Sequence, residues 1–280
     1  MTYLILGASG TVGSKVAEIL EQKGLDTRRA TRTPQKENEV HLDLVKGTGI
    51  TEAVKGATGI FLLSPPGHTR QDKLLAPVIE AAKKEGVSRV VLMTAMGVDA
   101  DDAIPFRQAE LQLEASGLPY QIIRPNWFMQ NFNSYWIHDI QHHHEIALPT
   151  GDAAGSFIDA RDIAAVAAAL LTSDRESGAY NLTGNQALTH QEVANILSEV
   201  SGREITYREI SPEETRQKLI AAGLPEDYAG FMLTILDAFK QGYAAPVSSA
   251  VKDILGREPI AFKTYVRDHA AAFSKEAVTH

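Results

Sequence analysis

The chain has 280 residues, of which 44% are hydrophobic and 22% charged, the composition of a globular protein with a large core. Its formal net charge of -8 and its scattered basic residues exclude the basic stripe that direct nucleic-acid binding requires. The absence of cysteine excludes disulfides, zinc thiolates, iron–sulfur clusters and thiol catalysis. The first residues show no secretory leader, and no apolar run reaches the ~20 residues of a membrane span, so we expect a cytoplasmic protein with no membrane partner.

Short apolar segments alternate with segments of helical period through the first two-thirds of the chain. Because parallel strands must be joined by crossovers, this alternation predicts an α/β protein with a Rossmann-type, doubly wound parallel sheet. Helices are expected after the first strand as far as Gly24, around residues 74–82, and over residues 105–116 and 160–171. The expected strands are residues 3–6, 27–30, 40–42, 59–63, 89–93, 120–123 and 180–182.

After Pro125 the pattern changes to aromatic and polar residues without a clear period. The last third of the chain is predicted to be mostly helical, with Thr189 capping one helix, Pro212 beginning another and residues 231–239 in a third. We therefore expect a smaller, mostly helical C-terminal lobe. The expected division is a main domain of residues 1–125 with 155–183 returning to it, and a small lobe of residues 126–154 and 184–280.

A glycine-rich turn lies directly between the first strand and the first helix. Its first glycine permits a tight bend, its second lets the backbone approach a pyrophosphate, and its third lets the helix pack on the strand. The alternative is an ordinary flexible turn, but the flanking strand and amphipathic helix favour a dinucleotide site at the positive end of the helix. The residues expected to bind the cofactor here are Gly7, Ser9, Gly10, Thr11, Val12 and Gly13.

The second strand is followed by Arg32, where a protein that binds NAD usually has an acidic residue for the ribose hydroxyls. An arginine offers a planar set of donors that suits a 2′-phosphate, so we predict NADP, with NADPH preferred over NADH. The alternative is a solvated surface charge. Lys36 is expected to reinforce the phosphate site, and Asp43 either contacts the adenine or forms a turn. The main domain is therefore expected to bind NADP(H), and the small lobe a substrate or a protein partner.

The chain resembles the NmrA-like branch of the atypical short-chain dehydrogenase/reductase superfamily, which includes NAD(P)H:quinone reductases and triphenylmethane dye reductases. The resemblance rests on the glycine turn of residues 7–13, on Arg32, on the tract of residues 123–132 and on residues 180–187 and 197–205, so it covers essentially the whole chain. It implies that residues at the ends of the fourth and fifth strands line the cofactor groove. These are Ser64, Pro65, Thr94 and Ala95.

The superfamily usually carries a Tyr-xxx-Lys pair on the helix after the fifth strand, in which the tyrosine donates a proton and the lysine lowers its pKa. The corresponding positions hold Phe106 and Glu110. A phenyl ring has no proton to donate, and a carboxylate would raise the pKa of a phenol. The sequence therefore predicts that carbonyl and alcohol are not interconverted by the usual mechanism.

Two functions remain. The first is a reductase that transfers hydride directly to a small, electron-poor aromatic acceptor such as a quinone or dye, which needs little help from a general acid. The second is a redox sensor that binds NADP(H) without turnover and acts through a protein partner. We favour the enzyme, because the aromatic tract offers an acceptor pocket, although the same rings could simply pack the lobe. The pocket residues expected are Phe106, Asn126, Trp127, Phe128, Asn131 and Trp136.

Four histidines, His138, His142, His143 and His144, lie close together in the sequence. A metal site would need further ligands beside these histidines, and the adjacent acid taken into account is Glu145. We expect a hydrophilic, solvent-facing stretch and no metal. The sequence leaves open the physiological acceptor and whether the chain forms a homodimer.

Overall fold

The computed structural model describes residues 1–274, which form two compact units. Residues 155–159 and 183, expected in the main domain, belong to unit 2, where β8 (Ala154–Gly155) pairs with β10 (Leu188–Thr189). Residues 250–257, expected in the small lobe, belong to unit 1, where α10 (Ala250–Leu255) packs on α6 (Ala160–Leu171). Unit 1 comprises Met1–Pro125, Ala160–Leu182 and Ala250–Arg257, and unit 2 comprises Asn126–Asp159, Thr183–Ser249 and the described residues from Glu258 on.

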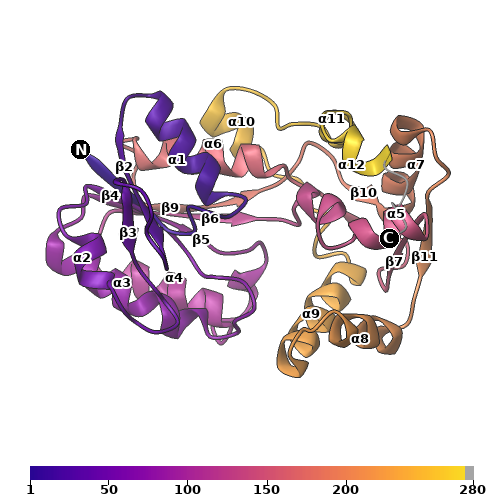
Figure 1. Cartoon of the computed structure of the whole chain (residues 1–280), viewed down its shortest axis with the longest axis horizontal. Helices are drawn as coiled ribbons and strands as arrows, with labels where there is room; N and C mark the ends of the chain where they lie inside the picture. Colours follow the sequence, from indigo (N-terminus) through magenta and orange to yellow (C-terminus); the bar gives the residue numbers. More distant parts are fainter. Residues whose placement is uncertain (275–280) are drawn as a thin grey trace. The chain divides into compact units, whose positions relative to one another are not determined.

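Unit 1 is built on a seven-stranded sheet with the order β3-β2-β1-β4-β5-β6-β9 (Figure 1). Every neighbouring pair is parallel, which confirms the α/β fold predicted from the alternating pattern. The strands are β1 (Thr2–Ile5), β2 (Asp26–Thr31), β3 (Glu39–His41), β4 (Gly59–Leu63), β5 (Arg89–Met93), β6 (Tyr120–Pro125) and β9 (Gly178–Leu182).

Helices cover both faces of this sheet (Figure 1). On one face, α3 (Gln71–Glu85) contacts both α2 (Ile50–Val54) and α4 (Pro105–Ala115). On the other face, α6 contacts both α1 (Gly13–Gln22) and α10. The short helix η1 (Val98–Ala100) follows β5. Two helical layers around one parallel sheet are the arrangement that the doubly wound prediction requires.

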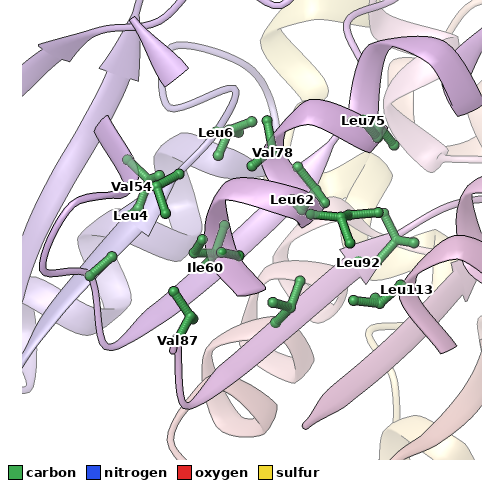
Figure 2. Close-up of a cluster of buried hydrophobic side chains, with 14 of the residues drawn as sticks. Leu4, Leu6, Val54, Ile60, Leu62, Leu75, Val78, Val87, Leu92 and Leu113 are labelled. Carbon is green, nitrogen blue, oxygen red and sulfur yellow. The ribbon is translucent and has the colours of Figure 1, made fainter. Parts of the chain in front are cut away.

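One hydrophobic core cluster of unit 1 lies between the sheet and the helices α2, α3 and α4 (Figure 2). Leu4, Ile60 and Leu92 come from three neighbouring strands, and Val78 and Leu113 come from the helices above them; all five side chains are buried. Fully burying one such side chain stabilises the folded state by about 1.5–3 kcal/mol. This packing fixes the strand ends to which the functional residues are attached.

The strand order reverses beside β1. The chain passes from β1 to β2 and β3 on one side, then returns to place β4 on the other side of β1. In open α/β sheets, ligands bind outside the carboxyl ends of the strands at such a reversal, because the connections there diverge to opposite faces and leave a crevice. We therefore expect a ligand site at the loops after β1 and β4.

Unit 2 combines helices with two small sheets: β8 pairs with β10 in antiparallel fashion, and β7 (Glu145–Leu148) pairs in parallel with β11 (Thr206–Glu209). The predicted cap at Thr189 is present, because its Oγ1 accepts from the Glu192 amide at 3.1 Å and a Glu192 carboxylate oxygen accepts from the Thr189 amide at 2.8 Å. In residues 1–274, no helix combines the length and apolarity needed to cross a membrane. The helices of unit 2 are η2 (Met129–Asn133), α5 (Ile137–His142), α7 (His190–Ser201), α8 (Pro212–Ala221), α9 (Glu226–Lys240), α11 (Phe262–Asp268) and α12 (Ala270–Ser274).

Candidate functional site

The glycine turn between β1 and α1 has no room for side chains at the position where the helix meets the strand. Gly7 has a φ of 62°, and its carbonyl accepts from the Gly10 amide at 2.8 Å, which closes the bend. A Cβ on Gly13 would lie 2.3 Å from the Gly7 oxygen and 2.7 Å from the Leu6 oxygen, so only glycine fits there. The first and third glycines therefore have the roles that the sequence predicts for them.

The amides of Thr11 and Val12 lie at the start of α1 and donate a hydrogen bond to no acceptor in residues 1–274. The first turn of α1 also carries no acidic side chain that could compete for them. Free amides at a helix N-terminus favour an anion, because their partial positive charges are not compensated within the helix. Ser9, Gly10 and Thr11 are exposed, so an anion can reach the turn from solvent.

Three arginines lie on or just after β2, and two of them are occupied. Arg28 donates to the backbone oxygens of Ala53 and Lys55, both at 2.8 Å. Arg29 donates twice to Glu21, at 3.0 Å and 2.8 Å. The guanidinium of Arg32 is exposed, and within the described chain it has no hydrogen bond or ion pair.

The free guanidinium of Arg32 follows the carboxyl end of β2, the strand next to β1. It is therefore the arginine of this group that remains available to a ligand. The ammonium of Lys36, four residues later in the same exposed loop, is likewise not paired within residues 1–274.

Asp43 shows the turn-forming role that was one of its two expected roles. Its Oδ1 accepts from the amides of Val45 and Lys46, each at 3.0 Å. These bonds, from Lys46 above all, hold the pKa of Asp43 below its ordinary value. Contact of this residue with an adenine remains a prediction.

The predicted residues after β4 and β5 lie at the carboxyl ends of neighbouring strands. Ser64 and Pro65 are half-buried, and the Ser64 hydroxyl donates to the Pro65 oxygen at 3.3 Å. Thr94 is buried, and its hydroxyl donates to Glu110 at 2.6 Å. With its hydroxyl bound to Glu110, Thr94 has only its backbone and its methyl group left for a ligand, and Ala95 likewise has only its backbone and its methyl group.

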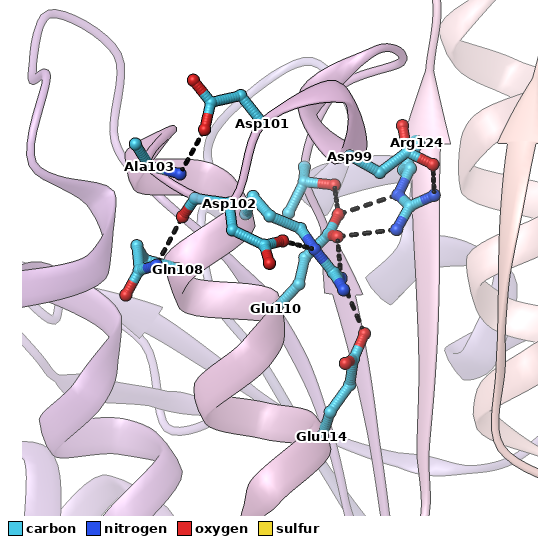
Figure 3. A network of polar contacts seen from close by, with 10 residues as sticks. Asp99, Asp101, Asp102, Ala103, Gln108, Glu110, Glu114 and Arg124 are labelled. Atoms are coloured by element: carbon cyan, nitrogen blue, oxygen red, sulfur yellow. Dashed lines mark hydrogen bonds and ion pairs between the residues drawn. The ribbon is translucent and has the colours of Figure 1, made fainter.

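Glu110, at the expected lysine position, is the centre of a buried ionic network (Figure 3). Its carboxylate accepts from Arg124 at 2.9 Å and 2.7 Å, from Arg107 at 2.9 Å and from the Thr94 hydroxyl. Burial alone would raise the pKa of Glu110, but the hydrogen bonds from Arg124, Thr94 and Arg107 outweigh it and leave this pKa below its ordinary value. Glu110 is thus an ionised group that ties α4 to the ends of β5 and β6.

Sequence reasoning missed the role of Arg124, although a signal was present. Arg124 lies in strand β6, whose residues from Gln121 to Pro125 are buried. A cation at such a position must find a partner, because an unpaired buried charge is strongly destabilising. Which acid would supply it was not visible, since Glu110 lies on a different element.

Of the six residues expected in the acceptor pocket, Phe106 is half-buried in α4 of unit 1, and the other five belong to unit 2. Asn126 uses both ends of its amide inside unit 2, donating to Ser156 at 2.7 Å and to the Ala244 oxygen at 2.8 Å and accepting from the Trp127 amide at 2.9 Å.

The rings of Trp127 and Trp136 stack with their centroids 6.0 Å apart. Phe128 and Asn131 are half-buried in the same unit. The aromatic tract therefore contributes to packing, and its contact with an acceptor stays a prediction.

The histidine stretch contains an acid that sequence reasoning did not consider. Ligand atoms of His138, Asp139 and His143 all lie within 4.8 Å of one another. The rings of His138 and His142 stack at 4.4 Å. Oδ2 of Asp139 is 2.6 Å from the ammonium of Lys218, so this carboxylate is already ion-paired. The expectation that no metal binds here stays a prediction.

A model of the NmrA-like family matches residues 1–255. The chain is 32% identical over 283 residues to an NAD(P)H azoreductase from Xenophilus azovorans, covering 96% of this chain and 98% of the relative. It is 33% identical over 273 residues to an uncharacterized oxidoreductase from Bacillus subtilis strain 168, covering 96% and 95%.

Two solved structures share the fold at low sequence identity. An NADPH-dependent quinone oxidoreductase from Escherichia coli in complex with NADPH has a TM-score of 0.83 at 22% identity, covering 96% of this chain and 99% of that chain. The triphenylmethane reductase from Citrobacter sp. in complex with NADP(H) has a TM-score of 0.75 at 22% identity, covering 96% and 100%.

Proposed function

The chain belongs to the NmrA-like family, and from this membership we propose that it is an NADPH-dependent reductase that transfers hydride directly to an electron-poor aromatic acceptor. One observation carries the proposal. The free amides of Thr11 and Val12 and the free guanidinium of Arg32 follow adjacent strands of one parallel sheet, at the point where the strand order reverses.

The residues of unit 1 fit a dinucleotide that carries a 2′-phosphate. The start of α1 packs directly on the glycine turn, because a side chain at Gly13 would collide with the Gly7 oxygen. Gly10 is exposed and has no side chain that would keep a pyrophosphate from the backbone. The amides of Thr11 and Val12 supply donors to it, and Arg32 supplies charge-assisted donors to the 2′-phosphate. When bound, the nicotinamide nucleotide supplies the hydride.

An acceptor such as a quinone or a cationic dye is compatible with Phe106 and Glu110, which stand where the superfamily usually has its proton-donating tyrosine and its lysine. Phe106 has no ionisable proton, and the Glu110 carboxylate is ionised and committed to its cations. A strongly electron-poor acceptor takes its proton from water after reduction, so the protein needs only to orient it. Relatives and structural neighbours named for azo compounds, quinones and triphenylmethane dyes support this class of acceptor.

The acceptor is proposed to lie against aromatic side chains of unit 2, among them Trp127 and Trp136. Both rings are half-buried, so part of each remains accessible. An indole offers a flat, weakly polar face on which a planar aromatic molecule can stack. The side-chain amide of Asn131 is a polar group of the same tract that is proposed to orient the oxygens of the acceptor, whereas the amide nitrogen of Gln130 donates to Asp159 at 3.0 Å.

The test follows NADPH consumption with a panel of quinones, azo dyes and triphenylmethane dyes, together with the dissociation constants of NADPH and NADH. We expect turnover with at least one member of the panel and tighter binding of NADPH. Failure to bind either nucleotide would overturn the proposal. Tight NADPH binding without oxidation by any acceptor would instead favour a redox sensor that acts through a protein partner.

A further inference from the structure

The loop of residues 32–38 carries both free cations of the candidate phosphate site, and the edge strand β3 holds this loop. The loop joins β2 to β3, and all seven of its residues are exposed. Two side chains of β3, Glu39 and His41, bind its backbone. Residues two apart on a strand point to the same face, so the spacing of Glu39 and His41 lets one short strand hold both parts of the loop.

His41 connects the loop to a neighbouring turn. Its Nδ1 lies 3.0 Å from the Arg32 backbone oxygen, and its Nε2 lies 3.0 Å from the Thr48 hydroxyl. A carbonyl oxygen can only accept, so Nδ1 carries the ring proton and Nε2 accepts from the hydroxyl. The ring thus connects the two segments, and its Nδ1–H donates to the backbone oxygen of Arg32.

The turn of residues 43–48, which contacts the His41 ring through Thr48, is held by hydrogen bonds of its own. Asp43 and Thr48 exchange two backbone hydrogen bonds, at 3.0 Å and 3.1 Å, and the Asp43 side chain caps the turn between them. Gly49 has a φ of 77°, and a Cβ there would lie 2.2 Å from the His41 oxygen and 2.8 Å from the ring carbon Cδ2. A glycine is therefore needed for the chain to pass this close to His41.

Glu39 holds the middle of the loop. One of its carboxylate oxygens accepts from the amides of Gln35 and Lys36, at 2.7 Å and 3.2 Å. These bonds, from Gln35 above all, keep the pKa of Glu39 below its ordinary value. The backbone of Lys36 is therefore anchored while its ammonium remains free.

We propose that His41 is a positioning residue for cofactor selection: it fixes the Arg32 peptide so that the guanidinium is held ready for the 2′-phosphate. This inference rests on the proposed function, in which Arg32 binds that phosphate. Anchoring a flexible loop before binding lowers the entropy that binding must remove, so affinity rises without a new contact to the ligand. NADH lacks the phosphate and gains nothing from this anchoring.

Two amide substitutions separate the two nitrogens of the ring. In His41→Asn the side-chain amide can place an N–H where Nδ1 donates to Arg32, whereas in His41→Gln it reaches toward Thr48 and loses the Arg32 bond. Loss of one well-placed hydrogen bond is expected to weaken NADPH binding by about tenfold in His41→Gln and His41→Ala. His41→Asn should keep most of the affinity, and NADH binding should stay within about twofold in all three.

The experiment measures dissociation constants of NADPH and NADH by calorimetry for these variants, for Arg32→Ala and for the Arg32→Ala/His41→Ala double variant. If His41 acts through Arg32, the double variant binds NADPH no more weakly than Arg32→Ala alone. Thr48→Val, which removes only the hydroxyl that supports the ring, should weaken NADPH binding in the same direction.

The outcomes distinguish the two proposals. If Arg32→Ala leaves the NADPH to NADH ratio unchanged, the assignment of the 2′-phosphate site fails, and the inference about His41 fails with it. If Arg32→Ala removes the preference but His41→Ala and Thr48→Val do not reduce it, only the inference is overturned. Equal weakening of both nucleotides in the His41 variants, or additive losses in the double variant, also overturns it.

Discussion

The guanidinium of Arg124 and the carboxylate of Glu110 form two parallel hydrogen bonds, at 2.9 Å and 2.7 Å, in the interior of unit 1 (Figure 3). The carboxylate is fully buried, and the guanidinium is 9% exposed. Such a planar, two-bond geometry offsets the cost of removing both charges from water. The pair joins β6 to α4, and through Thr94 it also holds the end of β5.

Glu110→Gln should destabilise the protein strongly. The amide keeps the size of the side chain but removes the buried anion, so Asp99, whose side chain is 42% exposed, is the remaining anionic partner of Arg124 in the described chain. Removing one partner of a buried pair costs about 3–5 kcal/mol, which should appear as a lower free energy of unfolding in urea. Glu114→Gln is the matched control, because this carboxylate binds the same Arg107 at 2.8 Å but is 30% exposed. Glu114→Gln should lower the free energy of unfolding by at most about 1 kcal/mol. Equal losses of stability in the two variants would contradict a buried ionic network centred on Glu110.

Stability should fall in mild acid because of His190. This imidazole is buried in unit 2, with its ring 5.0 Å from that of Phe239 and its Nδ1 2.9 Å from the Thr150 hydroxyl. Burial lowers the pKa of His190 from 6.5 to about 3. Between these values the folded state binds fewer protons than the unfolded state. The stabilisation is therefore complete above pH 6.5 and is lost as the pH falls toward 3, by up to about 1.4 kcal/mol per pH unit.

The measurement is the free energy of unfolding in urea from pH 7 to pH 5, above the range in which the carboxylates protonate. His190→Asn should flatten the slope, because the amide does not titrate there. His142→Asn is the control, since His142 is exposed on α5. The assignment would be wrong if His142→Asn flattened the slope and His190→Asn did not.

Much of the fold could be predicted from the sequence, and the reason is physical. Strands such as β4 and β5 are largely buried on both faces of the sheet, so they appear as apolar runs, which in β5 begin after Arg89. Both strands were predicted with their observed bounds. The two-residue strands β8 and β10 are too short to show any period. The return of α10 to unit 1 was also missed, because that helix has only six residues and its contacts lie far away in the chain.

The candidate site was predictable where its chemistry is local. The glycine turn and Arg32 lie beside recognisable elements, so position alone suggested their roles. Arg124 and His41 each bind a group from another part of the chain. Only the folded chain shows that Glu110 pairs with Arg124 and that the Arg32 carbonyl lies beside His41. The sequence likewise did not show that Arg28 and Arg29 are bound to other groups of the chain, which makes Arg32 the available arginine of the three.

The purified, untagged protein should not retain stoichiometric zinc. His138, Asp139 and His143 supply suitable atoms, but the ammonium of Lys218 lies 2.6 Å from Asp139 and opposes a second cation. Lys218→Met should therefore raise zinc affinity, measured by calorimetry, and adding His143→Gln should remove the gain. Stoichiometric zinc in the wild-type protein by metal analysis would contradict this prediction.

Gly13→Ala should weaken NADPH and NADH equally, unlike the variants of Arg32 and His41. A Cβ at this position would lie 2.3 Å from the Gly7 oxygen and 2.7 Å from the Leu6 oxygen. These are backbone atoms, so the turn itself must move away from the start of α1. Losing one charge-assisted hydrogen bond to the pyrophosphate weakens binding on the order of 10- to 100-fold, and both nucleotides share this pyrophosphate.

Gly24→Ala is the control, because it introduces backbone strain at a left-handed residue without displacing the glycine turn of residues 7–13. Gly24 follows α1 with a φ of 73°, and a Cβ there would meet nothing within 4 Å. The left-handed backbone should cost this variant about 1 kcal/mol of stability while both dissociation constants stay unchanged. If Gly13→Ala bound both nucleotides as tightly as Gly24→Ala, the amides of Thr11 and Val12 could not be the donors to the pyrophosphate, because their positions depend on the contact between Gly13 and Gly7.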